Sequence, residues 1–153
     1  MKRKVFFSFH FDKDSWRAGQ IRNIGAIESD KPVNGNIWEE VKEKDDNTIK
    51  KWIDSNLSDK SCLVVLIGEE TSERKWVRYE IKRAFELGKA VCGIYIHRLE
   101  DANGKQSARG ENPLVSNIPV FDSDYLSSSY VYDDIKNNIA DLVEKAIKEN
   151  DSN

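Results

Sequence analysis

The sequence predicts a three-layer α/β sandwich in which helices cover both faces of a central, mostly parallel five-stranded sheet. Three short apolar runs, at residues 5–9, 62–67 and 91–96, are nearly continuous and rich in β-branched or aromatic residues. Runs of this kind are typical of strands that are buried on both faces. Segments with helical periodicity lie between and after them, and strands that alternate with helices pair in parallel through right-handed crossovers.

The helical segments are predicted by apolar residues that recur every three or four positions. Such stripes occupy residues 49–57, 77–88 and 135–147, and the last is the most regular, so it predicts a terminal helix packed on the sheet. Acidic or hydroxyl residues precede the predicted helices at Asp14, at 45–48 and at 133–134, as suits helix N-termini. Gly88 is expected to end a helix over 73–87.

The rest of the chain is more polar. Residues 99–127 are expected to form a long loop that holds a strand near 118–121, and the aromatic and β-branched residues 130–132 predict a last short strand. The length of 153 residues is that of one ordinary domain, which we place at residues 1–149, followed by a polar tail at 150–153.

Composition argues against several classes of partner. With 24 basic and 27 acidic residues and a net charge of -3, the chain is not expected to bind nucleic acid or an anionic membrane. The apolar stretch after the basic N-terminus is too short for a signal peptide, and no segment is long enough to span a bilayer, so a cytoplasmic protein is expected. Cys62 and Cys92 lie in apolar runs without metal-binding spacing, and we interpret them as reduced core residues with no metal site.

In an open parallel sheet, ligands bind beyond the carboxyl ends of the strands. This rule selects Ser8, His10 and Phe11 after the first run, residues 68–71 after the second, and residues 97–98 after the third. Glycine-rich phosphate loops, HExxH and GxSxG are absent, and the lack of an acidic residue directly after Ile67 disfavours a phosphate-accepting receiver domain.

The residues most informative about function are a tryptophan and a glutamate in the helix predicted after residue 71. Trp76 and Glu80 are four residues apart, so they lie one turn from each other at the edge of the apolar stripe. A half-sheltered carboxylate beside an indole is one interpretation. The other is structural, with Glu80 paired to Arg78 or Arg83 and Trp76 packing the helix N-terminus.

The spacing of Ser72, Trp76 and Glu80 resembles the signature of TIR domains, in which a Trp precedes the catalytic Glu by four positions. The opening RKVFFSFH at residues 3–10 and the run WVRYEI at 76–81 resemble more closely the TIR-like ThsB component of bacterial Thoeris anti-phage systems. The resemblance covers roughly residues 3–98. It implies a flavodoxin-like or TIR-like fold for the single domain.

The resemblance also implies a reaction. TIR enzymes break the bond between nicotinamide and ribose in NAD, here a substrate rather than a cofactor, and the Thoeris likeness favours a cyclic ADP-ribose isomer that activates a partner effector. Glu80 is then the catalytic carboxylate, while Phe7, Ser8, His10 and Trp76 are expected to contact substrate, although Ser8 is equally suited to satisfy backbone groups and a lone His such as His10 is more often structural. A phage-derived trigger and assembly into a homo-oligomer are further expectations from the family.

Arginines are the natural candidates for the pyrophosphate of NAD, and the helices offer Arg17, Arg78 and Arg83, each of which also suits a solvated helix face. Two other functions stay open. One is a TIR module that only binds other proteins. The other is an N-glycoside enzyme similar to nucleoside deoxyribosyltransferases, in which a Glu acts as nucleophile on nucleosides.

Overall fold

Strands and helices alternate along the chain, as the sequence predicts. The computed structural model describes residues 2–29, 41 and 43–152. In chain order its elements are β1 (Lys4–Ser8), α1 (Phe11–Arg22), β2 (Glu28–Ser29), α3 (Asp46–Leu57), β3 (Cys62–Ile67), the 3₁₀ turn η1 (Thr71–Glu73), α4 (Lys75–Glu86), β4 (Ala90–Tyr95), β5 (Val120–Phe121) and α5 (Ser128–Asp151).

The strands form one sheet in the order β2-β1-β3-β4-β5, and every pair among the described strands is parallel. This is the flavodoxin-like order, and it confirms the predicted α/β class. The order reverses between β1 and β3. The carboxyl ends of these two strands therefore mark the edge at which a ligand is expected to bind.

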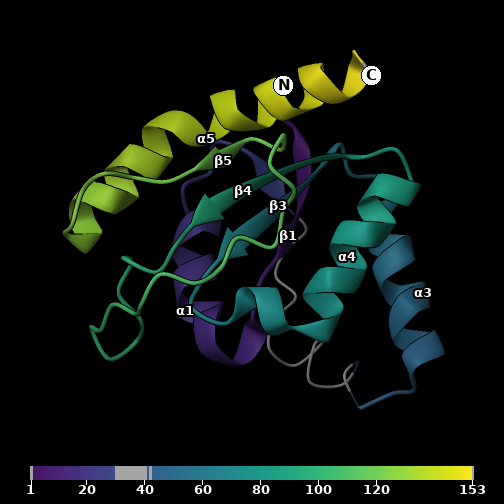
Figure 1. Ribbon diagram of the computed structural model, residues 1–153, viewed down its shortest axis with the longest axis horizontal. Coiled ribbons are helices and arrows are strands. Elements are labelled where there is room, and N and C mark those ends of the chain that lie inside the picture. The colour runs from purple at the N-terminus through teal and green to yellow at the C-terminus, as the bar shows by residue number, and fades with distance from the viewer. Residues whose placement is uncertain (1, 30–40, 42, 153) are drawn as a thin grey trace.

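Helices cover both faces of the sheet and make it three layers deep (Figure 1). On one face, α1 and α5 pack against alternate residues of β1, β3 and β4, such as Val5, Val64 and Cys92. On the other face, α3 and α4 pack against the intervening residues, such as Phe6 and Leu63. Because both faces are covered, all six residues of β3 and of β4 are buried, which explains their continuous apolar sequence.

One predicted strand is wrong, and one strand was not predicted. Residues 130–132 are not a strand, because α5 begins at Ser128 and Ser127 caps it by accepting a hydrogen bond from Tyr130 N. Val131 is 1 % exposed and extends the buried stripe of α5, so helical packing overrides its β-propensity. The fifth strand is instead β2, which has only two residues and no apolar run to reveal it.

Other boundaries differ by a few residues. The chain turns into α1 at Phe11, before the predicted start at Asp14, and α4 begins at Lys75 after the 3₁₀ turn. Gly88 has a φ of 72° and follows the end of α4, as predicted for a C-terminal glycine. Helix α5 continues to Asp151, so the first two residues of the predicted polar tail are helical.

The predicted long loop over 99–127 contains β5 and is fixed to the carboxyl edge of β3. Glu69 accepts a hydrogen bond from Ala108 N at 2.8 Å and pairs with Lys13 of α1 at 2.8 Å. Gly110 lies so close to the carbonyl oxygen of Gly68 that any side chain there would collide with it. These polar contacts and close backbone approach add to the apolar packing of Leu99 and Leu114, which are buried in the two cores.

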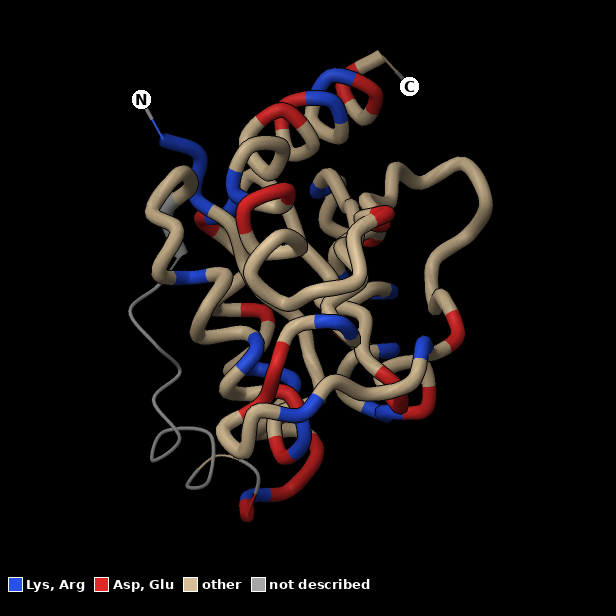
Figure 2. The backbone as a smooth tube through the Cα atoms, turned by 90° about the vertical axis from the view of Figure 1, so that its left-hand side faces the viewer, with Lys and Arg blue, Asp and Glu red and all other residues tan. Residues whose placement is uncertain are grey.

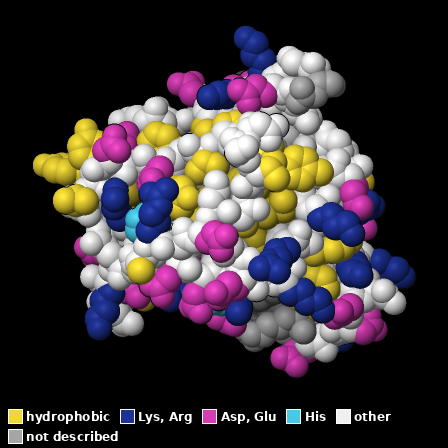
Figure 3. All heavy atoms as spheres, viewed as in Figure 1, with side chains coloured by type: hydrophobic (Ala, Val, Ile, Leu, Met, Phe, Trp, Pro, Cys, Tyr) yellow, Lys and Arg dark blue, Asp and Glu magenta, His cyan; other side chains and the backbone are white. Residues whose placement is uncertain are grey.

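Charges of both signs are interspersed along the chain and do not separate onto opposite sides (Figure 2). Hydrophobic side chains reach the surface at the end of the molecule where α5 begins (Figure 3). The exposed ones there include Tyr125, Leu126 and Tyr130. Among the described helices, none has the length and hydropathy needed to cross a bilayer.

Candidate functional site

Glu80 and Ser8, which are 72 residues apart in the sequence, meet in the interior. Ser8 ends β1 and is 1 % exposed, and Glu80 lies on the sheet-facing side of α4 and is 7 % exposed. Ser8 Oγ donates a hydrogen bond of 2.6 Å to Glu80 Oε1. The first strand and the helix after β3 thus place a hydroxyl and a carboxyl group together next to the switch point of the sheet.

The structural interpretation of Glu80 as a partner of Arg78 or Arg83 is wrong. Arg83 Nε donates to Asp54 Oδ1 at 2.8 Å, and Arg78 Nε donates to the carbonyl oxygen of Ser72 at 2.7 Å. Within the described part of the chain, no cation pairs with Glu80. A buried carboxyl group without a cation is unfavourable for stability, so its presence points to a functional reason.

Burial raises the pKa of Glu80 from its ordinary value of 4.5 to about 8, against the smaller lowering effect of the hydrogen bond from Ser8. The low-dielectric surroundings disfavour the charged form, and the single hydroxyl only partly compensates. With no cation beside it, Glu80 is therefore mostly protonated at neutral pH. A cation that entered the site would lower this pKa and favour the carboxylate.

This raised pKa predicts an unusual dependence of stability on pH. Between pH 4.5 and about 8, folded Glu80 keeps a proton that the unfolded chain has released, so the free energy of unfolding falls as the pH rises through this window. We expect Glu80→Gln to remove a slope on the order of 1.4 kcal/mol per pH unit. Urea unfolding of both proteins at pH 5, 6, 7 and 8 measures it, and parallel pH profiles would contradict the raised pKa.

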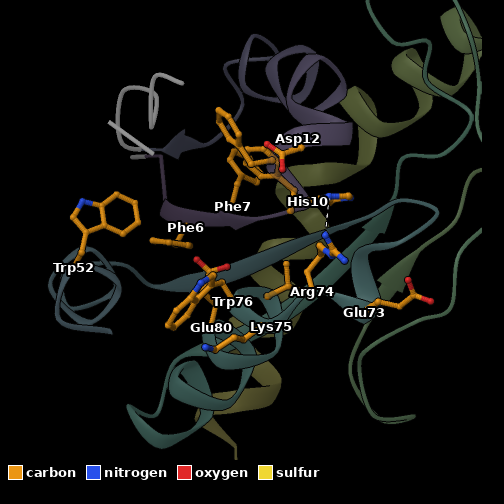
Figure 4. Close-up of a pocket in the computed structure, with 13 residues that line it drawn as sticks. Phe6, Phe7, His10, Asp12, Trp52, Glu73, Arg74, Lys75, Trp76 and Glu80 are labelled. Atoms are coloured by element: carbon orange, nitrogen blue, oxygen red, sulfur yellow. Dashed lines mark hydrogen bonds between the residues drawn. The ribbon is translucent and has the colours of Figure 1, made fainter. Parts of the chain in front are cut away.

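A cavity of about 400 Å³ opens beside Glu80 between β1, α1, α3 and α4 (Figure 4). Its lining is largely aromatic, and the aromatic residues are Phe6, Phe7, Phe9, Phe11, Trp52 and Trp76. Glu80, Trp76 and Phe6 gather toward one side, whereas His10 and Arg74 lie together at the other (Figure 4). A cavity of this size and apolar character suits part of a nucleotide rather than a solvated ion.

Trp76 lies one turn before Glu80 on α4 and is partly exposed to the cavity. Its ring packs edge to face on Tyr79 at 5.7 Å between centroids, and Lys75 Nζ lies 4.8 Å from its centroid. Trp52 of α3 lines the cavity from the opposite wall (Figure 4). A planar cationic ring would find two indole rings in this cavity, and such rings bind cations well.

His10 is the N-cap residue that precedes α1, and it lines the same cavity with 9 % of its surface exposed. Its Nε2 lies 3.4 Å from Nη1 of Arg74. Burial and the neighbouring Arg74 charge lower the pKa of His10, so it is neutral at physiological pH. Its Nδ1 is buried and has no hydrogen-bond partner within the described part of the chain.

The structure brings together all five residues that the sequence predicts for the site. Phe7, His10, Trp76 and Glu80 line the cavity, and Ser8 lies behind it and holds Glu80. The sequence did not single out Trp52 or Arg74, which line the cavity as well. Trp52 belongs to the apolar stripe of α3, so its spacing in the sequence predicted only that it packs in the core. Nothing in the sequence around Arg74 predicted a role in binding, apart from its place at the start of a helix.

Arg17 and His97, which the charge pattern and the rule for strand ends selected, have structural roles, and so do the two cysteines. Arg17 is 1 % exposed, pairs with Asp14 at 2.8 Å and donates to the carbonyl oxygen of Leu99 at 2.7 Å, so it does not face the cavity. His97 packs edge to face on Tyr95 at 5.9 Å. Cys62 and Cys92 are both free and buried, with 3.8 Å between their sulfur atoms.

Within residues 2–29, 41 and 43–152, no three His, Cys, Asp or Glu side chains form a group that could hold a metal ion. The chemistry that the described residues support is that of one buried carboxyl group, one hydroxyl and an aromatic cavity with a basic end. This arrangement can stabilise a positive charge that develops on a bound molecule.

The amino-acid sequence is similar to those of known proteins. The family described as "Thoeris protein ThsB, TIR-like domain" matches residues 6–101, which include β1, β3, α4 and β4. The chain belongs to the ThsB TIR-like family. It is also 34 % identical over 138 residues to a protein of Bacillus cereus (strain MSX-D12) named "Putative cyclic ADP-D-ribose synthase ThsB1", a match that covers 87 % of this chain and 67 % of that protein.

Every cavity residue lies inside the segment that the ThsB family match covers. The loop from 102 onward and α5 lie outside it, although α5 completes the core on the α1 face. In this ThsB-like chain the segment outside the family match contributes to the core through α5 and does not line the cavity.

Proposed function

We propose that this protein cleaves the bond between nicotinamide and ribose in NAD and releases a cyclic ADP-ribose-type signal that activates an effector in anti-phage defence. The observation that carries the proposal is the buried Glu80, which pairs with no cation of the described residues and is held by Ser8 beside an aromatic cavity. Membership of the ThsB family and the name of the Bacillus cereus relative support the same reaction.

The chemistry requires only one carboxylate. Nicotinamide is a pyridinium in NAD and leaves as a neutral molecule, taking the electron pair of the glycosidic bond, so no general acid is needed. Positive charge then develops on C1′ and the ring oxygen of the ribose. Glu80 as a carboxylate stabilises that charge, and it does so strongly because the site is buried. Glycosidases of ordinary sugars instead need a pair of carboxyl groups.

The raised pKa of Glu80 fits this sequence of events. The pyridinium charge of NAD lowers the pKa of Glu80 when the substrate binds, so the carboxylate forms where the cation lies. After nicotinamide leaves, a hydroxyl of the same ADP-ribose attacks C1′ and releases its proton. The aromatic walls exclude water and favour this internal attack over hydrolysis.

Incubation of purified protein with NAD, at low and high protein concentration, tests the proposal through the release of free nicotinamide. A nucleoside with an acceptor base runs in parallel. We expect nicotinamide from NAD and no base exchange on the nucleoside. Base exchange without NAD cleavage would favour the deoxyribosyltransferase alternative, and inactivity on both, in buffer and in lysate of infected cells, would favour a module that only binds proteins.

A further inference from the structure

The end of the cavity that holds His10 and Arg74, called the basic end, is formed by the N-terminus of α4, although the carboxylates of Asp12 and Glu73 also line the cavity. Arg74 is the N-cap residue, Lys75 is the first helical residue, and both line the cavity. The first turn has no acidic residue, and no side chain caps it. Within residues 2–29, 41 and 43–152, the backbone N–H groups of this turn and the positive end of the helix dipole therefore have no capping side chain of the kind that usually stabilises a helix N-terminus.

Arg74 is available to such a partner. Among the described residues, no carboxylate lies within ion-pair distance of its guanidinium, whereas the neighbouring Lys75 pairs with Asp46 at 2.6 Å. Arg74 is exposed, and among the described residues the hydrogen-bond contact of its head group is with the imidazole of His10. Glu73 also lines the cavity, but its carboxylate points away from Arg74 and His10 (Figure 4).

His10 supplies an independent observation. A guanidinium only donates hydrogen bonds, so Nε2 of His10 accepts from Arg74 and the proton of the neutral imidazole is on Nδ1. That N–H is buried and finds no acceptor in the described part of the chain. A donor left without an acceptor is unfavourable, and an oxyanion bound at Arg74 provides one after a rotation of the imidazole.

The spacing along α4 relates this end of the cavity to Glu80. Arg74 precedes Glu80 by six residues, which corresponds to about 9 Å along the helix axis. A ribose that contacts Glu80 through its hydroxyls carries its 5′-phosphate on the far side of the sugar ring. The basic end lies on the side of the cavity away from Trp76 and Phe6, so a phosphate that extends from the ribose toward it reaches the Arg74 guanidinium (Figure 4).

We propose that Arg74, together with His10 and the first-turn N–H groups of α4, binds the 5′-phosphate on the nicotinamide side of the dinucleotide. The identity of this ligand rests on the proposed function. These groups take the place of the three arginines that the sequence predicted as candidates for binding the pyrophosphate. Arg17, Arg78 and Arg83 bind other groups of the protein and do not line the cavity.

Two ligands that differ by one phosphate test the proposal. Nicotinamide mononucleotide and nicotinamide riboside are titrated by calorimetry into the Glu80→Gln variant, which prevents turnover. We expect the mononucleotide to bind about tenfold more tightly, and Arg74→Gln in the same background to abolish this preference. Arg74→Lys should keep part of it. Lys82→Gln removes the same charge from an exposed position of α4 and should keep all of it.

The outcomes separate this inference from the proposed function. A phosphate preference that survives Arg74→Gln, or no preference in the parent variant, overturns the phosphate site even if the wild type cleaves NAD. A preference that depends on Arg74 supports the site even if NAD is not cleaved. With turnover, Arg74→Gln should raise KM for NAD about tenfold and leave kcat nearly unchanged, and circular dichroism confirms that the variants are folded.

Discussion

Glu80→Gln is expected to lower the rate of nicotinamide release from NAD by about 10³-fold, the size of effect seen when one electrostatic group is removed from a buried active site. The amide has nearly the shape of the carboxyl group and can still accept the hydrogen bond from Ser8, but it cannot become an anion. Steady-state kinetics at saturating NAD measure the loss, because the carboxylate acts on the transition state rather than on ground-state binding.

Two further variants test whether the loss of activity in Glu80→Gln is due to the missing carboxylate. Ser8→Ala removes the hydrogen bond that lowers the pKa of Glu80, so we expect a smaller loss, about tenfold, with the pH at which activity rises shifted upward. Lys82→Gln, an exposed substitution on the same helix, should leave the rate unchanged. If Glu80→Gln is folded and as active as Lys82→Gln, the catalytic assignment of Glu80 is wrong.

Arg17→Met is expected to produce the largest loss of stability, about 3–5 kcal/mol in the free energy of unfolding. Arg17 and Asp14 form an ion pair whose side chains are 2 % and 0 % exposed, and Gly68 packs directly on the carboxylate of Asp14. Without the guanidinium, that carboxylate is buried without a cation, and Leu99 O loses its donor. Equilibrium unfolding in urea measures the change.

The double variant Asp14→Asn/Arg17→Met is the control. It removes both charges, so it should recover a clear part of the stability that the single variant loses, and the difference reports the coupling between the two side chains. A loss below about 1 kcal/mol for Arg17→Met would show that the pair is not buried as described. It would also reopen the sequence-based suggestion that Arg17 is free to bind a pyrophosphate.

The central strands could be predicted because their environment is simple. β3 and β4 are buried on both faces, so nearly every residue must be apolar, and the run itself shows where each strand lies. The failures lie where tertiary contacts decide the local structure. Residues 130–132 have strand-like composition, but the packing of Val131 on the sheet and the cap at Ser127 make them the first turn of α5.

The site was predictable in its parts but not in its contacts. The ends of buried strands selected Ser8 and His10, and helical spacing selected Trp76 and Glu80. The hydrogen bond between Ser8 and Glu80 depends on β1 and β3 being neighbours in the sheet, which no local pattern encodes. The place of Arg74 in the site could not be predicted for a related reason. An arginine at the start of a helix is recognised as a binding residue only once the structure shows that it lines the cavity and contacts His10.

The mass of the nucleotide that the wild-type protein forms from NAD tests the central claim most directly. Purified protein is incubated with NAD, and the products are separated and weighed by mass spectrometry, with Glu80→Gln as the matched blank. The account predicts free nicotinamide together with a species lighter than ADP-ribose by one water, in equal amounts and absent from the blank. Nicotinamide formed equally by both proteins, or no nucleotide product at any protein concentration or in infected-cell lysate, would contradict it.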